Sequence, residues 1–160
     1  MRLTSYKKLS EEDKNFLISA KKTAERSVTL KGHKIGCLII CSDGSTYLGA
    51  TAARTRVVGS TCAERMALDQ WYFSDAKTDP QICYLTGVLN RISWRDDFVC
   101  TPCGACLEMF LELFVERNLK SLKFVCSNWR LNKVLIADLS ELFPQIGKGG
   151  WPYIKHKGIR

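Results

Sequence analysis

The spacing of hydrophobic and polar residues along the chain predicts alternating helices and strands. Ser10 is followed by three acidic residues, as is typical of a helix start, and apolar side chains then recur at helical spacing. We therefore expect an amphipathic helix over residues 10–27. Residues 35–42 and 45–53 flank an Asp-Gly pair, which supplies the positive φ angles of a tight turn, and predict a β-hairpin.

Two helices and a strand are expected after the hairpin. One helix starts from Cys62, with apolar side chains along one face, and the apolar run 82–89 predicts a buried strand. Pro102 suits the first turn of the other helix, where the missing N–H of proline is not needed. The apolar stripe of that helix consists of Leu107, Phe110, Leu111 and Phe114.

Residues 122–127 and 133–137 predict two more strands, and a short helix is expected from about residue 138. This order of elements predicts an α/β fold, a three-layer α-β-α sandwich whose mixed sheet has about five strands. Residues 1–160 are expected to form a single domain, with a basic irregular tail from about residue 146.

Composition places the chain among ordinary globular proteins, with 46% hydrophobic and 25% charged residues. No apolar run reaches the ~20 residues that a bilayer-spanning helix needs, and the first residues lack the apolar core of a secretory signal. We therefore expect a cytoplasmic protein with no membrane partner. In that reducing compartment the 8 cysteines are expected to be metal ligands and buried thiols rather than disulfides.

The net charge of +8 results from 24 basic and 16 acidic residues. Such an excess is typical of a solvated surface, and it also creates a field that attracts anionic partners, including nucleic acid. No nucleic-acid-binding motif accompanies the charge, so a nucleic-acid partner is not expected.

Three cysteines stand at predicted helix starts. Cys103 and Cys106 form a C-x-x-C pair, a spacing that occurs in zinc half-sites, in redox pairs and by chance. Cys62 opens the other helix, so three thiols can meet where two positive helix ends converge and stabilise thiolates. Three thiolates on Zn²⁺ leave one position open, as in catalytic zinc sites, unless Cys100 closes the site into a structural Cys₄ centre.

Glu64 lies two residues after Cys62, a separation at which helical side chains do not share a face. In a first helical turn its carboxylate can still reach a water molecule on the metal and exchange protons with it. The alternative is an acid that complements the positive end of the helix dipole. Beside three thiols we favour proton transfer, because a closed structural site would give Glu64 no role.

The segments TCAER, at residues 61–65, and PCGAC, at residues 102–106, together resemble the zinc signature of the cytidine deaminase superfamily. The resemblance extends from about residue 10 to residue 144. A cysteine at the first ligand position is similar to the branch of small cytidine deaminases and blasticidin S deaminases.

The resemblance implies a zinc-bound hydroxide that displaces ammonia from the substrate while Glu64 transfers protons. The backbone N–H of Ala63 would orient the base. Arg65 would accompany the thiolates as a neighbouring positive charge, unless it is a plain surface arginine. The Zn²⁺ ligands implied are Cys62, Cys103 and Cys106.

The substrate-binding positions differ from those of the family. In cytidine deaminases the second hairpin strand carries an Asn and, two residues later, a Glu that hold the ribose; here Thr51 and Ala53 stand at these positions. An alanine cannot hydrogen-bond a sugar hydroxyl, which weakens the case for ordinary cytidine recognition. An aromatic residue near the base is replaced by His33 or Lys34, and His33 is a candidate substrate contact.

Arg54 and Arg56 follow these positions and could receive a carboxylate or phosphate, or belong to a solvated basic loop. The function implied is zinc-dependent hydrolytic deamination of a cytosine-like nucleoside, a nucleoside analogue or a related aminated heterocycle, in nucleoside metabolism. A homo-oligomer is expected, a tetramer by resemblance or else a dimer. Alternatives are a nucleotide or nucleic-acid deaminase, which the positive charge favours, and a zinc-stabilised scaffold without catalytic activity.

Overall fold

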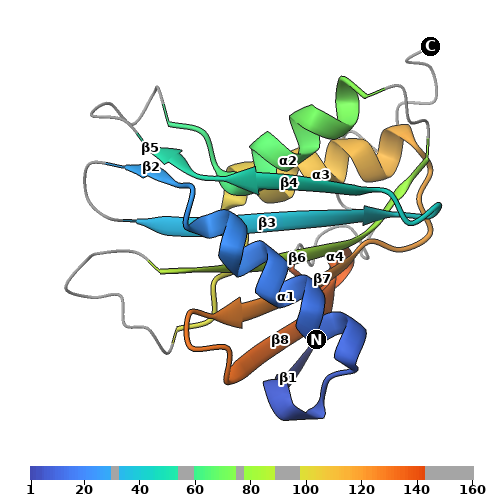
Figure 1. The fold of residues 1–160 in the computed structure, drawn as a ribbon. Coiled ribbons are helices and arrows are strands. Elements are labelled where there is room, and N and C mark those ends of the chain that lie inside the picture. Colours follow the sequence, from blue (N-terminus) through green and yellow to red (C-terminus); the bar gives the residue numbers. More distant parts are fainter. Residues whose placement is uncertain (30–32, 54–59, 75–77, 89–97, 143–160) are drawn as a thin grey trace.

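A computed structural model describes residues 1–29, 33–53, 60–74, 78–88 and 98–142 (Figure 1). The strands are β1 (Arg2–Ser5), β2 (Val28–Thr29), β3 (Lys34–Cys41), β4 (Thr46–Ala50), β5 (Ala52–Ala53), β6 (Pro80–Val88), β7 (Lys123–Asn128) and β8 (Lys133–Asp138). The helices are α1 (Glu11–Ala24), α2 (Ala63–Tyr72), α3 (Gly104–Glu116) and α4 (Leu139–Leu142), with a 3₁₀ turn η1 (Tyr6–Lys8) before α1.

The main sheet has six strands in the order β1-β8-β7-β6-β3-β4, and β2 pairs with β5 in a separate two-stranded ribbon. Only the β6–β7 pair of the main sheet is parallel. Helix α1 covers one face of this sheet, and α2 and α3 cover the other (Figure 1). The predicted three-layer sandwich with a mixed sheet is therefore confirmed.

Two hydrophobic clusters hold the layers together. Leu17 and Ala20 of α1 pack on Leu38, Tyr84 and Val125 of the sheet. On the opposite face the alternate residues of the same strands pack under α2 and α3, as the two-residue period of a strand requires. The residues involved include Cys37, Ile39, Cys83, Leu85, Phe110, Leu113 and Phe124.

Most predicted elements are found within a few residues of their expected bounds. Ser10 caps α1, because its hydroxyl accepts a hydrogen bond from the Asp13 amide. The hairpin turns at Gly44, which has φ +84. One placement was wrong. Pro102 precedes α3 instead of lying in its first turn, because Cys103, with extended φ and ψ, is the N-cap residue.

Two strand features differ from the prediction. The run 45–53 divides at Thr51, where the chain leaves the main sheet and β5 joins β2. The sixth strand, β1, pairs antiparallel with the edge strand β8, and its four residues carry no hydrophobic alternation by which it could have been recognised. The tail after residue 142 lies outside the described residues. None of the described helices combines the length and apolar composition that crossing a bilayer requires.

Candidate metal centre

Three thiols from two helix N-termini come together on one side of the sheet. Cys62 is the N-cap residue of α2, and Cys103 is the N-cap residue of α3. Cys106 lies one turn into α3 and is buried. The three sulfur atoms all lie within 4.8 Å of one another, and the sulfurs of Cys62 and Cys103 are 3.9 Å apart. Neither N-cap sulfur accepts a hydrogen bond from the backbone of its own helix, so neither is used as a helix cap.

The main chain fixes where these two helices begin. The bridge between Ala52 and Thr61 holds the segment before α2 against the β5 ribbon. The amide of Cys100 donates a hydrogen bond of 3.1 Å to the carbonyl of Ser127, which ties the segment before α3 to the end of β7. The thiols therefore lie at the carboxyl ends of the parallel strands β6 and β7, where open α/β sheets usually bind ligands.

The donor set fits a zinc ion. Sulfurs bound to one tetrahedral Zn²⁺ at about 2.3 Å lie about 3.8 Å apart, close to the 3.9 Å between Cys62 and Cys103. Thiolates are soft ligands that suit zinc better than magnesium or calcium. Cys100 is not among the described residues whose donor atoms meet in this group. The closed Cys₄ centre considered from the sequence is therefore not formed by these side chains.

Charge at the cluster favours an ionised sulfur. The pKa of the Cys62 thiol is lowered to about 6, chiefly because the Cys106 thiol hydrogen-bonds to it, and then through Cys103 and the positive charge of Arg65. The same hydrogen bond and burial raise the pKa of Cys106. Arg65 itself is exposed in the first turn of α2.

Glu64 is the acid associated with the cluster. Its side chain is only 4% exposed, and burial, with the nearby Cys62 charge, raises its pKa to about 7. An acid that merely complemented the helix dipole would be expected in solvent at the first turn. Burial beside thiols is instead the environment found around catalytic carboxyl groups.

The buried cysteines behind the cluster are structural, as the sequence suggested. Cys37 and Cys83 belong to the core, and their sulfurs are 3.4 Å apart across β3 and β6. Cys100 and Cys126 are buried in the same core. Burial raises the pKa of Cys100 and Cys126, so both are neutral hydrophobic fillers near neutral pH.

Two of the predicted substrate contacts, Thr51 and His33, are buried polar residues next to β4 and β3. Thr51 is 8% exposed, and its hydroxyl has no hydrogen-bond partner among the described residues. Thr51 connects β4, whose Gly49 packs on α2, with the β5 ribbon. His33, 9% exposed, comes directly before β3.

The positions of the other predicted substrate contacts say less about substrate binding. Ala63, the first residue of α2, is buried, and Ala53 pairs with Thr29 in the β5 ribbon. Arg54 and Arg56 fall outside the described residues. That the Thr51 hydroxyl would be buried, with no partner among the described residues, could not be seen in the sequence, because it depends on how β4 ends.

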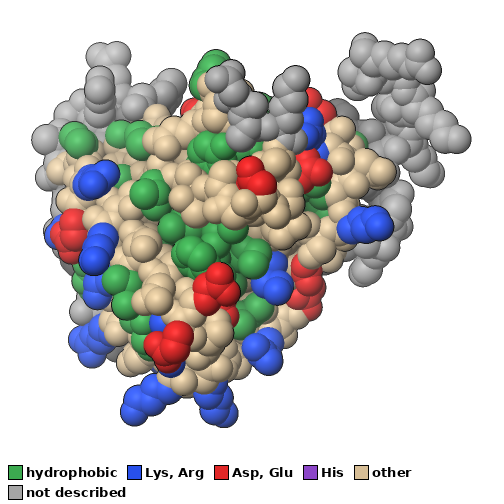
Figure 2. All heavy atoms as spheres, turned by 45° about the vertical axis from the view of Figure 1, so that its right-hand side comes forward, with side chains coloured by type: hydrophobic (Ala, Val, Ile, Leu, Met, Phe, Trp, Pro, Cys, Tyr) green, Lys and Arg blue, Asp and Glu red, His purple; other side chains and the backbone are tan. Residues whose placement is uncertain are grey.

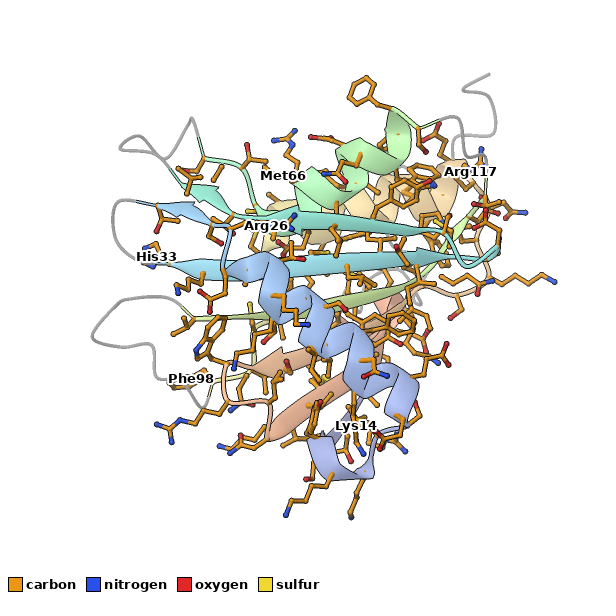
Figure 3. The ribbon with its side chains drawn as sticks, viewed as in Figure 1. Lys14, Arg26, His33, Met66, Phe98 and Arg117 are labelled. Carbon is orange, nitrogen blue, oxygen red and sulfur yellow. The ribbon has the colours of Figure 1, made fainter. Side chains whose placement is uncertain are left out.

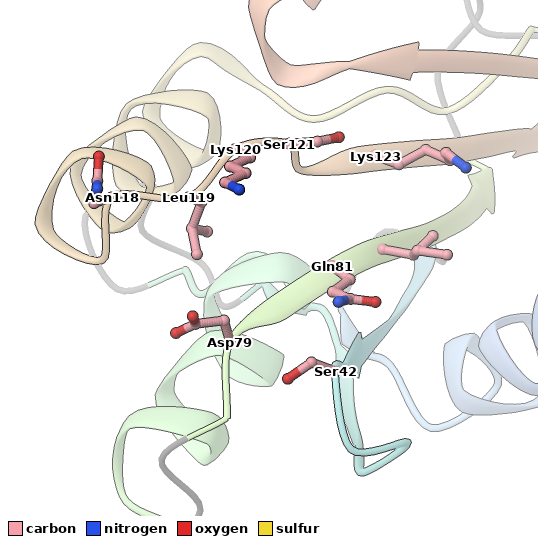
Figure 4. A pocket seen from close by; sticks show the side chains of 9 residues that line it. Ser42, Asp79, Gln81, Asn118, Leu119, Lys120, Ser121 and Lys123 are labelled. Atoms are coloured by element: carbon pink, nitrogen blue, oxygen red, sulfur yellow. The ribbon is translucent and has the colours of Figure 1, made fainter.

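A cavity of about 520 Å³ lies at the other end of the sheet and is separate from the thiols (Figure 4). Ser42, Asp79 and Gln81 form one wall, and the connection between α3 and β7 forms the other. No cysteine lines it. The thiol cluster is therefore the better candidate for a catalytic site.

Comparison with known proteins supports this assignment. Residues 10–119 match the family profile described as the cytidine and deoxycytidylate deaminase zinc-binding region. The match includes every thiol of the cluster and Glu64. No curated protein sequence matches the chain significantly.

Solved structures share the fold at low identity. The cytidine deaminase from Burkholderia pseudomallei has a TM-score of 0.67 and 20% identity, with 84% of this chain and 96% of that chain covered. The cytidine deaminase from Mycobacterium leprae has a TM-score of 0.62 and 16% identity, with coverages of 86% and 100%. That from Bacillus anthracis has a TM-score of 0.59 and 17% identity, with coverages of 87% and 94%.

Proposed function

Since the chain belongs to the family of the cytidine and deoxycytidylate deaminase zinc-binding region, we propose that it deaminates a cytosine-like nucleoside, a nucleoside analogue or a related aminated heterocycle. Membership makes it a zinc-dependent deaminase, a hydrolase acting on C–N bonds of cyclic amidines. The observation that carries the proposal is the meeting of three thiols and a buried carboxylic acid at two helix N-termini. A scaffold needs no such acid beside an incompletely filled ligand set.

Each site residue is assigned a role in this reaction. Cys62, Cys103 and Cys106 hold the zinc ion. Bound there, Zn²⁺ supplies a Lewis acid that lowers the pKa of water and makes it a nucleophile near neutral pH. Glu64 moves protons, and Arg65 stabilises the charge of the thiolates.

The overall change is balanced by two proton transfers. The oxygen of water bonds to the ring carbon that carries the amino group, and the bond between that carbon and the amino nitrogen breaks. Glu64 passes one water proton to the ring nitrogen and the other to the departing amino group, which leaves as ammonia. Burial keeps the Glu64 carboxyl away from bulk water, so that its protons go to the substrate.

Residues around the thiols hold the heterocycle in place. We assign the orientation of the base to the amide of Ala63, the first residue of α2. The Thr51 hydroxyl, which has no partner among the described residues, would contact a substrate hydroxyl or amino group. His33, Ala53 and Arg54 complete the proposed set of substrate contacts.

Ammonia release from aminopyrimidines, aminopurines and their nucleosides tests the proposal. The Glu64→Gln variant should retain zinc and lose at least ~100-fold in kcat, the usual contribution of a general acid–base residue. Glu108→Gln, which changes an exposed acid on α3, is the matched control and should keep full activity. If the zinc-loaded protein released no ammonia from any of these compounds, the result would favour the alternative, a zinc-stabilised scaffold without catalytic activity.

We further propose a homo-oligomer, with a tetramer favoured over a dimer. Exposed apolar side chains at the ends of α2 and α3 support this: Phe73 and Tyr72, at the end of α2, are 90% and 47% exposed, and Val115, near the end of α3, is 42% exposed. Light scattering after gel filtration measures the assembly, and Phe73→Ser should weaken it. A monomer at micromolar concentration would contradict the proposal. A cytoplasmic location is also proposed, because the site needs reduced thiols.

A further inference from the structure

The cavity that is separate from the thiols lies where β6 and β7 begin (Figure 4). Strand β6 pairs with β3 from Pro80 onward, whereas its pairing with β7 starts only at Ile82, opposite Lys123. The first two residues of β6 are therefore not paired with β7, and the cavity opens beside them. Figure 3 shows Arg117 at this end of the sheet and His33 at the opposite end, where β3 starts and the thiols lie.

The chain that leaves the C-terminus of α3 forms one wall of the cavity, and a tight turn fixes its shape. Asn118, which lines the cavity, has φ 51, in the left-handed region that Asn tolerates better than most residues. Its amide donates a hydrogen bond of 3.2 Å to the carbonyl of Val115, and the amide of Leu119 donates one of 3.0 Å to the carbonyl of Phe114. These two bonds form a Schellman motif, which ends the helix and turns the chain toward β7.

Further hydrogen bonds hold the two walls in place. The Nε atom of Arg117 donates a hydrogen bond of 2.9 Å to the Asp79 carboxylate, which joins the end of α3 to the residue before β6. The Ser42 amide donates one of 3.0 Å to the carbonyl of Asp79. On the other wall, the Ser121 hydroxyl donates one of 2.7 Å to the Asp138 carboxylate at the end of β8. The lining is therefore preorganised, as in most small-molecule sites.

The lining residues carry an excess of positive charge. The acid among them, Asp79, is neutralised by its ion pair with Arg117. Lys120 and Lys123 form no ion pair with a described residue, although Asp138 stands opposite Lys123 in the strand register. In Figure 4 the side chain of Lys120 points from the connection between α3 and β7 toward the wall that β6 forms. An anionic group is therefore attracted to the wall with the lysines.

The wall beside β6 offers neutral hydrogen-bonding groups. The Ser42 hydroxyl and the Gln81 side-chain amide line it, and neither makes a hydrogen bond to a described residue. Together with the Asp79 carboxylate they both donate and accept, as the hydroxyl groups of a sugar require. Ile82 and Leu119 add apolar surface on which the carbon atoms of such a molecule can pack. Figure 2, in which this end of the sheet comes forward, shows hydrophobic side chains near the centre of the face with charged ones around them.

We propose that this cavity binds a small hydroxylated anion, a sugar phosphate or a sugar acid. The anionic group lies at Lys120 and Lys123, and the hydroxyl groups face Ser42 and Gln81. The volume of about 520 Å³ is within the range of ~300–1,000 Å³ that is typical of small-molecule sites. No cysteine lines the cavity, so its ligand is not the heterocycle on which the proposed deaminase acts, and the inference does not depend on that function.

The first test is calorimetric titration of the zinc-loaded chain with glucose 6-phosphate, gluconate, glucose and inorganic phosphate. We expect one of the two sugar anions to bind with a Kd of about 1 mM or less, and glucose at least ~10-fold more weakly, because glucose has no charge for the lysines. Which sugar anion binds more tightly distinguishes phosphate from carboxylate recognition. If neither sugar anion bound at about 10 mM, or if inorganic phosphate bound as tightly as the better of them, the inference would be overturned.

The second test uses variants to locate the bound anion. Lys120→Gln and Lys123→Gln should each weaken binding of the preferred sugar anion by roughly 3-fold to 5-fold, the effect of a partly exposed ion pair. Gln81→Ala should weaken binding of the sugar anion but not of inorganic phosphate. Lys22→Gln, which removes an exposed lysine of α1 away from the cavity, is the matched control and should leave the Kd unchanged. All four variants should retain zinc. A Kd that stayed the same in both Lys120→Gln and Lys123→Gln would place the anion elsewhere, such as on the zinc ion, and would overturn the inference.

Discussion

The backbone carbonyl of Ala63 passes so close to Gly49 that a Cβ atom added to Gly49 would lie 1.9 Å from its oxygen. The same added atom would lie 2.6 Å from the Ala67 amide nitrogen. Helix α2 thus rests directly on the backbone of β4, one residue after the N-cap that carries the Cys62 thiol. The absence of a side chain at Gly49 sets the height of the metal centre above the sheet.

Gly49→Ala is therefore expected to be strongly destabilising. The atoms it would meet are backbone, which cannot move aside as a flexible side chain does, so we expect a loss of roughly 3 kcal/mol in the free energy of unfolding. The displaced α2 should also bind zinc less well. Urea denaturation and metal analysis measure both effects.

Gly104→Ala is the control for this substitution. No heavy atom lies within 4 Å of a Cβ at Gly104, and the residue begins α3, where alanine is a better helix former. Its stability should be within about 0.5 kcal/mol of the wild type. If Gly49→Ala were equally harmless, the contact between β4 and α2 would not fix the site.

Cys106→Ala should abolish zinc binding at the cluster. Two thiols with no third protein ligand hold zinc poorly, so the metal content should fall from about one ion per chain to nearly none. Chelator should then lower the melting temperature of the wild type but not of the variant, because only a protein that binds the metal is stabilised by it.

Cys83→Ala tests whether the buried thiols have any part in metal binding. Cys83 is fully buried and its sulfur contacts that of Cys37, so its loss should cost stability but not zinc. Elemental analysis of both purified variants gives the comparison. Zinc retained by Cys106→Ala, or lost from Cys83→Ala, would contradict the ligand assignment.

Much of the fold could be predicted because local patterns determine it. The periodicity of α1 and its Ser10 cap, and the Asp-Gly turn with Gly44 at φ +84, are local features of the chain. The thiol cluster could be expected for a similar reason, since Cys62 and Cys103 both stand where helices begin. What remained for the structure to show was that the two helices start side by side.

Other features depend on contacts between distant segments. Strand β1 exists because β8 offers an unpaired edge, and its own four residues carry no alternation. Lys21 and Trp129, which are 108 residues apart, likewise give no sign in the sequence that they touch. The burial of Glu64 likewise depends on the packing of α2 over the sheet.

Arg65→Ala should weaken zinc retention. Arg65 is one of the groups that lower the pKa of Cys62, after the thiols of Cys106 and Cys103, and it is the positive charge among them. Loss of a neighbouring group that supports a ligand typically costs about 10-fold or more in metal affinity. Transfer of zinc to a chromogenic chelator measures the change.

Arg65→Lys separates charge from shape, since it keeps the positive charge and should restore most of the affinity. Arg117→Ala removes another exposed arginine, which pairs with Asp79 away from the thiols, and should not affect zinc transfer. Unchanged zinc transfer in Arg65→Ala would identify Arg65 as a plain surface residue.

The hydroxyl of Tyr84, in the middle of β6, donates a hydrogen bond of 2.6 Å to the Asp13 carboxylate at the start of α1. Tyr84→Phe removes this bond between the sheet and the helix, and a hydrogen bond to a charged group is worth about 2 kcal/mol. The effect should also depend on pH. Burial, then the Asp13 hydrogen bond and charge, raise the pKa of Tyr84 above its usual value.

Because the folded pKa of Tyr84 lies above the unfolded one, near 10, the contribution of the hydroxyl is complete below about pH 10 and is lost as pH rises beyond it. The difference in unfolding free energy between the wild type and Tyr84→Phe should therefore be constant from pH 7 to about 9.5 and shrink above pH 10. Urea denaturation at several pH values gives this difference directly, since other groups that ionise in the same range cancel between the two proteins. If the difference in unfolding free energy stayed constant through pH 11, the bond to Asp13 would not be what keeps the Tyr84 phenol protonated.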